Sequence, residues 1–244
     1  MRIDNTGFGN IKVIQTEGMG YGVDSVLLAA FAAGETGARG VRKAARIADL
    51  GSGSGVVGFI MCHKADAEVV GYEKRESAVD RASRAAEMNE MTDRISFVQK
   101  DVVDIPVYGQ TPEHFDAVVS NPPYFRKSSA IPCMIDDKFV ARHETTADIG
   151  DFGRAAAYLL DKGGDFYLVH RPDRLVDIFE AMRLAGVEPK EIQFVLPKPG
   201  EAANIVLIHG VKGAGRELKL LPDITVHNED GSYTDVIEKL YERK

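Results

Sequence analysis

The sequence has few cysteines, no long apolar run and no excess of positive charge. Its two cysteines, Cys62 and Cys133, lie far apart and outside any CxxC or Cys/His metal pattern, so we expect reduced, buried thiols. The longest apolar stretch, residues 26–33, is far shorter than the ~20 residues that a bilayer requires, and we expect no signal peptide. The formal net charge of -7 argues against broad nonspecific binding to nucleic acid, because the long-range field repels a polyanion. Any contact with RNA or DNA must therefore be local.

Length and composition are those of a globular domain. The 244 residues, 44% hydrophobic and 27% charged, can bury a full core, and single α/β domains of this length are common. We expect one domain, 1–244, in which a core at 34–210 lies between an N-terminal extension (1–33) and a C-terminal extension (211–244). A cytoplasmic enzyme or binding protein is the default expectation, without a membrane, a metal or an obligatory protein partner; the oligomeric state stays open.

Strand-like and helix-like segments alternate along the core. Five segments are typical of strands: 47–50, 68–72, 95–98, 115–120 and 165–170. Helical patterns separate them, among them 151–160, which is expected to end at Gly163-Gly164. Strands 192–196 and 204–209 are joined by the short loop 197–200, which suits an antiparallel hairpin. We therefore predict an α/β, Rossmann-like, seven-stranded and mostly parallel sheet with an antiparallel C-terminal hairpin and helices on both faces.

Smaller elements are expected at the two ends. Residues 1–15 alternate loosely in hydrophobicity and are expected to form a small β extension. An apolar helix follows at 26–32, for which Asp24 or Ser25 is a credible N-cap. From residue 218 onward a strand-like segment, a turn and a short amphipathic helix are expected.

The chemistry is expected to centre on the tetrapeptide Asn121-Pro122-Pro123-Tyr124, which follows the apolar strand 115–120. Ligands of open α/β sheets bind beyond the carboxyl ends of the strands. Two prolines remove two N–H donors and stiffen the loop, so that it presents hydrogen-bond acceptors. The Asn121 side-chain oxygen and the Pro122 carbonyl could each accept one N–H of an exocyclic amine, with the Tyr124 ring stacked on the attached π-system. A simple proline-rich turn is the alternative.

A glycine-rich loop is the second motif. Asp49 lies at the end of the first core strand and is followed by Gly51, Gly53 and Gly55, where the backbone can approach a ligand without a Cβ in the way. With Gly58 the loop also contains a GxGxxG pattern, which could indicate NAD. The packed GxGxG spacing and an anion at Asp49, suited to a cationic amino group, favour S-adenosylmethionine instead.

Two more acids follow predicted strands. Glu73 stands about 20 residues after the glycine loop, where such folds place an acid against ribose hydroxyls. Asp101 follows the next strand and could accept a hydrogen bond from an adenine amino group. An acid at a strand end is also common by chance, and Asp101 could be an ordinary surface acid.

Two groups of basic residues are candidates for RNA contacts. The segment 125–149 interleaves basic and aromatic side chains beside the expected site, as a nucleic-acid lid does, although a solvated mobile loop is the alternative. Its candidate substrate contacts are Phe125, Arg126, Lys127, Arg142 and His143. The second group precedes the first core strand and is either a solvated face or a phosphate contact: Arg39, Arg42, Lys43 and Arg46.

Together these motifs carry a resemblance to a known family. The glycine loop with the Asn-Pro-Pro-Tyr sequence resembles class I, S-adenosylmethionine-dependent amino-group methyltransferases over roughly residues 21–210. More closely, the segments 22–28, 141–144 and 169–172 resemble the bacterial tRNA1(Val) adenine-N6 methyltransferase family, which methylates the purine immediately 3′ of the anticodon.

The resemblance implies a role for each motif. It implies catalytic roles for Asn121, Pro122 and Tyr124, with Pro123 beside the substrate. It also implies cofactor contacts from these residues: Gly22, Asp24, Asp49, Gly51, Gly53, Gly55, Glu73, Asp101 and Asn121. The implied cofactor is S-adenosylmethionine and the implied partner is tRNA.

Three functions stay open on the sequence alone. The first is methylation of an RNA adenine. The second is methylation of a protein glutamine, whose amide presents the same pair of N–H donors. The third is a non-catalytic cofactor-binding or RNA-binding module, against which the complete Asn-Pro-Pro-Tyr motif argues.

Overall fold

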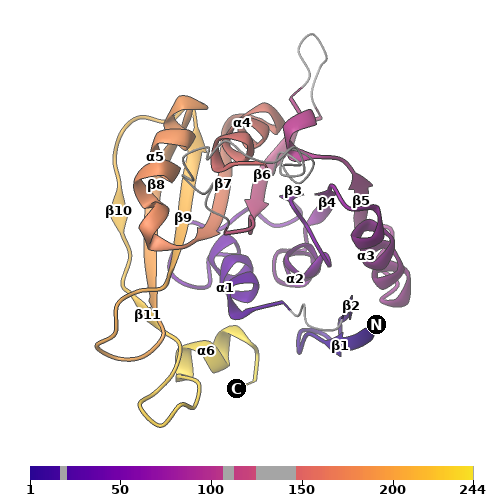
Figure 1. Ribbon diagram of the computed structural model, residues 1–244, viewed down its shortest axis with the longest axis horizontal. Helices are drawn as coiled ribbons and strands as arrows, with labels where there is room; N and C mark the ends of the chain where they lie inside the picture. Colours follow the sequence, from indigo (N-terminus) through magenta and orange to yellow (C-terminus); the bar gives the residue numbers. More distant parts are fainter. Residues whose placement is uncertain (17–20, 107–112, 125–146, 244) are drawn as a thin grey trace, which may run out of the picture.

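The computed structural model describes residues 1–16, 21–106, 113–124 and 147–243 (Figure 1). Its centre is a sheet with strands in the order β10-β8-β9-β7-β6-β3-β4-β5, and β11 also pairs with β8. Strands β3 to β7 run parallel, whereas β9 is antiparallel to both β7 and β8. The strand bounds are β3 Arg46–Leu50, β4 Glu68–Glu73, β5 Ile95–Gln99, β6 Phe115–Ser120, β7 Leu160–His170, β8 Val187–Leu196, β9 Ile205–Lys212, β10 Lys219–Leu220 and β11 Ile224–Thr225. The predicted seven-stranded sheet with its antiparallel hairpin is confirmed, and the two-residue strands β10 and β11 extend it.

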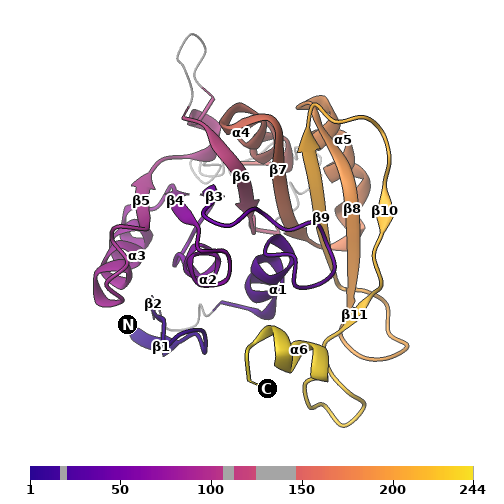
Figure 2. The same cartoon turned by 180° about the vertical axis from the view of Figure 1, so that it is seen from behind.

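Helices cover both faces of the sheet. Their bounds are α1 Val23–Ala32, α2 Val56–Ala65, α3 Glu76–Met88, α4 Ile149–Leu159, α5 Leu175–Leu184 and α6 Asp235–Leu240. Successive strand residues point to opposite faces, so Ile47 and Val119 join the core with α1 and α2, whereas Ala48 and Val118 join the core with α4 and α5. Figure 2 shows the same layers from behind. Among the described residues, no helix is both long and apolar enough to cross a bilayer.

The two ends of the chain pack on the helices that cover one face. The expected β extension is an antiparallel hairpin of β1 Arg2–Asn5 and β2 Lys12–Gln15. Asn89 fixes it to the end of α3, because its amide accepts from the Lys12 N–H at 2.8 Å and donates to the Lys12 carbonyl at 2.7 Å. The terminal helix α6 buries Ile237 and Leu240 in the core that contains α1.

Three predicted boundaries were wrong. Helix α1 begins at Val23 with Gly22 as its N-cap and without a side-chain cap, because the Asp24 carboxylate binds the Ser25 N–H within the first turn. Strand β7 begins at Leu160, so Gly163 and Gly164 lie in its irregular start and not at a helix end. A register shift against β6 accommodates them.

Strand β8 is also longer than predicted. It begins at Val187, five residues before the predicted start, and its pairing with β9 shifts register between Pro189 and Glu191. A proline inside the segment concealed this start, because proline cannot donate to a ladder and is expected at a bulge or an edge.

Candidate active site

Three predicted site segments meet at the carboxyl ends of neighbouring parallel strands. Strand β3 pairs in register with β4 on one side and with β6 on the other. The residues that follow these three strands are therefore neighbours: the glycine loop from Gly51, the end of β4 at Glu73, and Asn121. The fold brings the predicted cofactor loop and the predicted catalytic loop to one sheet edge, where ligands of this class of sheet bind.

The glycine loop adopts a backbone that only glycine tolerates well. Gly51, Gly53 and Gly55 have φ values of 73°, 57° and 78°, in the left-handed region that side chains rarely adopt. A Cβ on Gly55 would lie 2.4 Å from a ring atom of Phe97. The loop is thus held close to the sheet and leads directly into the N-terminus of α2, the geometry that suits an approaching nucleotide.

Glu73 joins this loop to the start of α3. The residue is 6% exposed, and its Oε2 accepts from the Gly53 N–H at 3.0 Å. Its Oε1 accepts from the backbone N–H and from Nε of Arg75, both at 2.9 Å. A carboxylate has about four lone-pair sites, so these three bonds leave Glu73 acceptor capacity beside the loop. That capacity suits a hydroxyl donor such as a ribose.

Asp49 is the most deeply buried acid of the site. It is 1% exposed, and its Oδ2 has no hydrogen-bond partner in the described part of the chain. The pKa of Asp49 is raised to about 7, mainly by burial; a hydrogen bond from the Gly58 backbone opposes the rise, and the negative charge of Glu73 adds to it. An unpartnered carboxylate oxygen beside the glycine loop fits a cationic group, held directly or through a water, because a buried charge needs a partner.

Asp101 lies two residues beyond β5 and already has two partners. One oxygen accepts from the Val103 N–H at 3.2 Å and caps a short 3-10 turn. The other lies 3.0 Å from the Lys74 ammonium. The carboxylate is therefore held in one orientation beside β4, and its contact with an adenine amino group stays a prediction.

The Asn-Pro-Pro-Tyr loop is held by the first turn of α1. The Asn121 Nδ2 donates to Ser25 Oγ at 3.1 Å. The Tyr124 hydroxyl lies 2.8 Å from Asp24 Oδ2 and 3.0 Å from Asn121 Oδ1. These contacts orient the Asn121 amide so that its nitrogen faces α1 and its oxygen faces Tyr124. The side chain that sequence reasoning placed at the centre of the site is thus fixed by residues about a hundred positions earlier.

The Tyr124 ring packs edge-on against a residue of β7. Its centroid lies 5.0 Å from that of His170, at an interplanar angle of 63°. Burial raises the pKa of Tyr124, the Asp24 charge adds to this, and the Arg171 charge opposes it. Burial also lowers the pKa of His170, whose Nδ1 accepts from the Arg171 N–H at 2.8 Å. The hydroxyl and the imidazole are therefore both held neutral.

The other predicted site residues divide into two groups. Gly22 is exposed as the N-cap of α1, and Pro123 is exposed beside the buried Pro122. The remaining substrate contacts lie outside the described residues: Phe125, Arg126, Lys127, Arg142 and His143. Cys62 is buried as predicted, and Cys133 also lies outside the described residues.

The basic group that precedes β3 lies at the opposite edge of the sheet. Arg42 binds both oxygens of Asp116 at 2.8 Å, at the start of β6, and the Arg46 N–H donates to the same carboxylate. The Arg39 guanidinium lies 3.5 Å from Asp165. A cavity of about 370 Å³ lies among these paired charges. These arginines join the α1–β3 linker to the amino ends of the strands, far along the sheet from Asn121.

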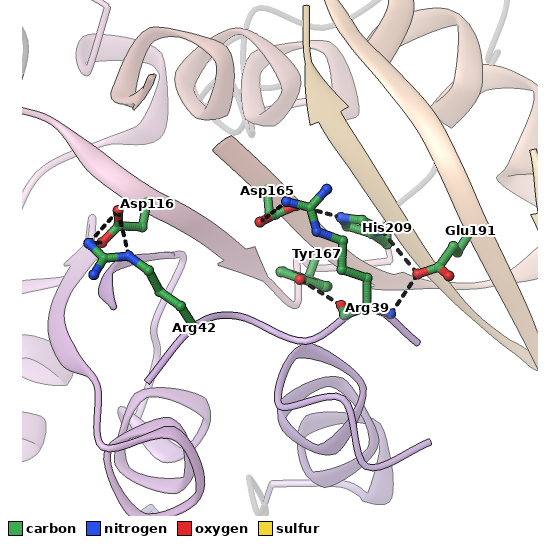
Figure 3. Close-up of polar contacts among 7 residues, drawn as sticks. All are labelled: Arg39, Arg42, Asp116, Asp165, Tyr167, Glu191 and His209. Carbon is green, nitrogen blue, oxygen red and sulfur yellow. Dashed lines mark hydrogen bonds and ion pairs between the residues drawn. The ribbon is translucent and has the colours of Figure 1, made fainter. Parts of the chain in front are cut away.

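A buried polar group completes this attachment (Figure 3). His209, which is 1% exposed, lies between Asp165 and Glu191 at 2.8 and 3.2 Å and stacks on Tyr167. The Tyr167 hydroxyl donates to the Arg39 carbonyl, and the Arg39 N–H donates to Glu191, both at 2.8 Å. Strands β7, β8 and β9 are thereby tied to the linker that fixes the end of α1.

Comparison with known proteins assigns the fold to a family. Residues 25–183 match the methyltransferase small domain family. The chain belongs to this family. The tRNA1(Val) (adenine(37)-N6)-methyltransferase of Bacteroides thetaiotaomicron is 29% identical in an alignment of 233 positions that covers 91% of this chain and 90% of the relative. The enzyme of the same name from Porphyromonas gingivalis is 31% identical over 181 residues, 73% of this chain and 69% of the relative. The family resemblance predicted from the motifs is confirmed, and the protein is a methyltransferase.

Solved structures share the fold. A predicted O-methyltransferase from Agrobacterium tumefaciens superposes with a TM-score of 0.70 at 26% identity, covering 90% of this chain and 95% of that one. The Thermus thermophilus 16S rRNA N2 G1207 methyltransferase, solved with AdoMet and guanosine, gives a TM-score of 0.58 at 22% identity over 86% of this chain and 50% of that one. The class I methyltransferase fold, predicted from the alternation of strands and helices and from the C-terminal hairpin, is confirmed.

Sequence reasoning missed three contacts of this methyltransferase site. It treated Ser25 only as a capping candidate, and it gave no role to His170 or Arg171. The segments 22–28 and 169–172 had been noted as family-like, so a signal was present. The sequence does not reveal that β6 pairs with β7 or in which direction α1 runs. These two features bring segments 22–28 and 169–172 against Tyr124.

Proposed function

We propose that this methyltransferase transfers a methyl group from S-adenosylmethionine to N6 of an adenine in tRNA. We further propose that the target is the adenine 3′ of the anticodon in tRNA1(Val). The observation that carries the proposal is the Asn121 amide, whose oxygen is oriented by Ser25 at the sheet edge shared with the glycine loop. The names of the relatives support the choice of tRNA.

The cofactor would occupy the loop between β3 and α2. Gly51 to Gly55 would lie against its nucleoside, Glu73 would accept from ribose hydroxyls, and Asp49 would attract its amino group directly or through a water. The left-handed glycines, the acceptor capacity of Glu73 and the unpartnered Asp49 oxygen support this fit. S-adenosylmethionine, when bound, supplies an electrophilic methyl group.

The Asn-Pro-Pro-Tyr loop would prepare the amine for attack. Asn121 Oδ1 and the Pro122 carbonyl would each accept one N–H of the exocyclic amine, which favours a pyramidal nitrogen whose lone pair is directed away from the ring. Tyr124 would stack on the base and hold it in this position. The methylated nitrogen would lose one proton to water, and breaking of the methyl–sulfur bond would leave S-adenosylhomocysteine. Positioning and fixed dipoles would supply the rate enhancement, so that no general base with a shifted pKa would be needed.

Substrate access requires the base to leave its stack. Nucleotides of an RNA loop are unstacked at low cost, and RNA-binding proteins recognise them by stacking on aromatic side chains and by hydrogen bonds to base edges. Arg171, which is exposed and lies beside His170 and Tyr124, is placed to contact a neighbouring phosphate.

The test is methyl transfer from labelled cofactor to three substrates. These are a tRNA1(Val) transcript, the same transcript with guanine in place of the adenine 3′ of the anticodon, and total protein from a cell extract. Nucleoside analysis should find N6-methyladenosine only in the first transcript, and Asn121→Ala should abolish most of the signal. Label in a protein glutamine and none in RNA would assign the amide substrate instead.

A further inference from the structure

The Tyr124 hydroxyl lies between two acceptors. Asp24 Oδ2 is 2.8 Å away and Asn121 Oδ1 is 3.0 Å away. A tyrosine hydroxyl has one proton to donate, so it cannot serve both acceptors fully. Which acceptor receives the proton decides whether the Asn121 oxygen is free for a substrate N–H.

The carboxylate is the stronger acceptor. Hydrogen bonds to ionised acceptors are roughly twice as strong as those between neutral groups, and the Asp24 contact is also the shorter one. The Asp24 carboxylate is fixed in place, because its other oxygen accepts from the Ser25 N–H at 2.9 Å. The Tyr124 proton therefore lies mainly toward Asp24.

The same helix turn sets the direction of the Asn121 amide. Ser25 Oγ, buried at the start of α1, accepts from Asn121 Nδ2 and keeps the amide oxygen on the side of Tyr124. With the nitrogen occupied by Ser25 and the hydroxyl proton drawn to Asp24, the Asn121 oxygen keeps its lone pairs.

We propose that Asp24 is a positioning residue, which holds the Tyr124 hydroxyl away from Asn121 Oδ1 and so keeps that oxygen available to accept an N–H of the substrate amine. The inference rests on the proposed function. It gives Asp24 a role that differs from lining the cofactor cleft, because it acts through Tyr124 on the substrate side of the site.

We predict that removing the Tyr124 hydroxyl suppresses the loss of rate caused by Asp24→Ala. In Asp24→Ala the Tyr124 hydroxyl donates to Asn121 Oδ1 and occupies one of its two lone pairs, so it competes with the substrate N–H for this oxygen. The net strength of one neutral hydrogen bond corresponds to a fall in the single-turnover rate of about threefold to tenfold. Tyr124→Phe removes the competing hydroxyl, so in that background Asp24→Ala should change the rate by less than about twofold. The double variant should therefore methylate faster than Asp24→Ala alone.

The controls separate this role from folding and from cofactor binding. Asp235→Ala removes an exposed first-turn acid from α6 and should leave the rate unchanged. Melting temperature and cofactor affinity are measured for every variant, and Asp24→Ala should leave cofactor affinity within about twofold of the parent.

The outcomes are distinguishable. An equal loss of rate from Asp24→Ala in both backgrounds, with an active parent, would overturn the inference alone. A loss of cofactor affinity that accounts for the whole effect would overturn it as well and would return Asp24 to the cofactor cleft. A parent that methylates no RNA would overturn the proposed function and the inference with it.

Discussion

Cofactor affinity should depend on the ionisation of Asp49. The free protein holds this carboxyl buried, with a pKa raised to about 7, so near neutral pH only part of the population carries the charge that attracts a cationic amino group. Binding of that group would favour the ionised form. Affinity should therefore rise as pH rises through 7.

The size of the effect follows from the ionised fraction. With a pKa of about 7, Asp49 is roughly 10% ionised at pH 6 and roughly 90% ionised at pH 8. Apparent affinity scales with the fraction of the competent state, so it should increase about tenfold over this interval. The α-amino group of the ligand loses its own proton near pH 8, which would reduce the gain at the upper end.

Calorimetry with S-adenosylhomocysteine from pH 6 to pH 8 measures this. Asp49→Asn keeps the size of the side chain but has no carboxyl group to titrate. The affinity of this variant for S-adenosylhomocysteine should therefore be low, and its pH dependence should reflect only the amino group of the ligand. Asp101→Asn serves as a matched acid at the same sheet edge and should retain the parental pH dependence. A parental rise that persists unchanged in Asp49→Asn would refute the assignment.

The raised pKa of Asp49 also makes the stability of the folded protein depend on pH. The unfolded chain ionises Asp49 near pH 4, whereas the folded protein keeps the proton until about pH 7. Between these values the folded state binds the extra proton, so its stability falls as pH rises and stays reduced above pH 7. Asp49→Asn should therefore gain stability relative to the parent at pH 8, by no more than roughly 4 kcal/mol, and should lose that advantage near pH 4.

Four further sets of substitutions test other residues of the chain. Glu73→Ala should weaken cofactor binding by about 1.5–3 kcal/mol through lost charge-assisted hydrogen bonds. If calorimetry finds unchanged affinity, Glu73 only holds the glycine loop in place and does not bind the cofactor. Asn121→Ala should lower turnover by about 10²–10³-fold at nearly constant cofactor affinity, and Asn121→Asp, which keeps an acceptor oxygen and loses only the amide donor, should retain more activity in single-turnover assays. Paired neutralisation of Arg126 with Lys127, or of Arg142 with His143, should raise the Michaelis constant for tRNA and flatten its salt dependence, whereas loss of folding with intact RNA affinity would make these residues structural. His209→Phe should remove one hydrogen-bond partner from each of the Asp165 and Glu191 carboxylates and should cost about 1–3 kcal/mol in chemical denaturation, and a loss below 1 kcal/mol would show that the group adds little.

Much of the fold could be predicted because local and global signals agree. The buried parallel strands are short apolar runs, such as Phe115–Ser120, that end in the polar residues of the site. Glycines with left-handed backbone are visible in sequence as a repeated spacing. These features require no knowledge of partners, because each follows from what one segment needs on its own.

The predicted starts of strands were wrong where pairing with a neighbouring strand overrides the local conformational preference of the residues. Residues 160–164 and 187–191 become strand because neighbouring strands offer ladder partners, and in both places the register shifts to accommodate glycine or proline. The arginines before β3 could be read as a phosphate site because their acids, Asp116 and Asp165, are remote in sequence. Charge pairing of this kind is decided by topology, which a list of charged residues does not contain.

The least predictable part of the site is the support given to Asn121 by α1. Ser25 and Asp24 lie 96 and 100 positions before the residues they hold, and in sequence they are most simply explained as helix-capping residues. They reach the Asn-Pro-Pro-Tyr loop because α1 packs along the sheet with its N-terminus at the carboxyl edge, while the linker at its other end is fastened by Arg39 to β7 and β8. Because α1 is anchored at one end and contacts the Asn-Pro-Pro-Tyr loop at the other, we expect a loosened linker to disturb the Asn121 amide. The turnover of His209→Phe should therefore fall by more than its cofactor affinity does.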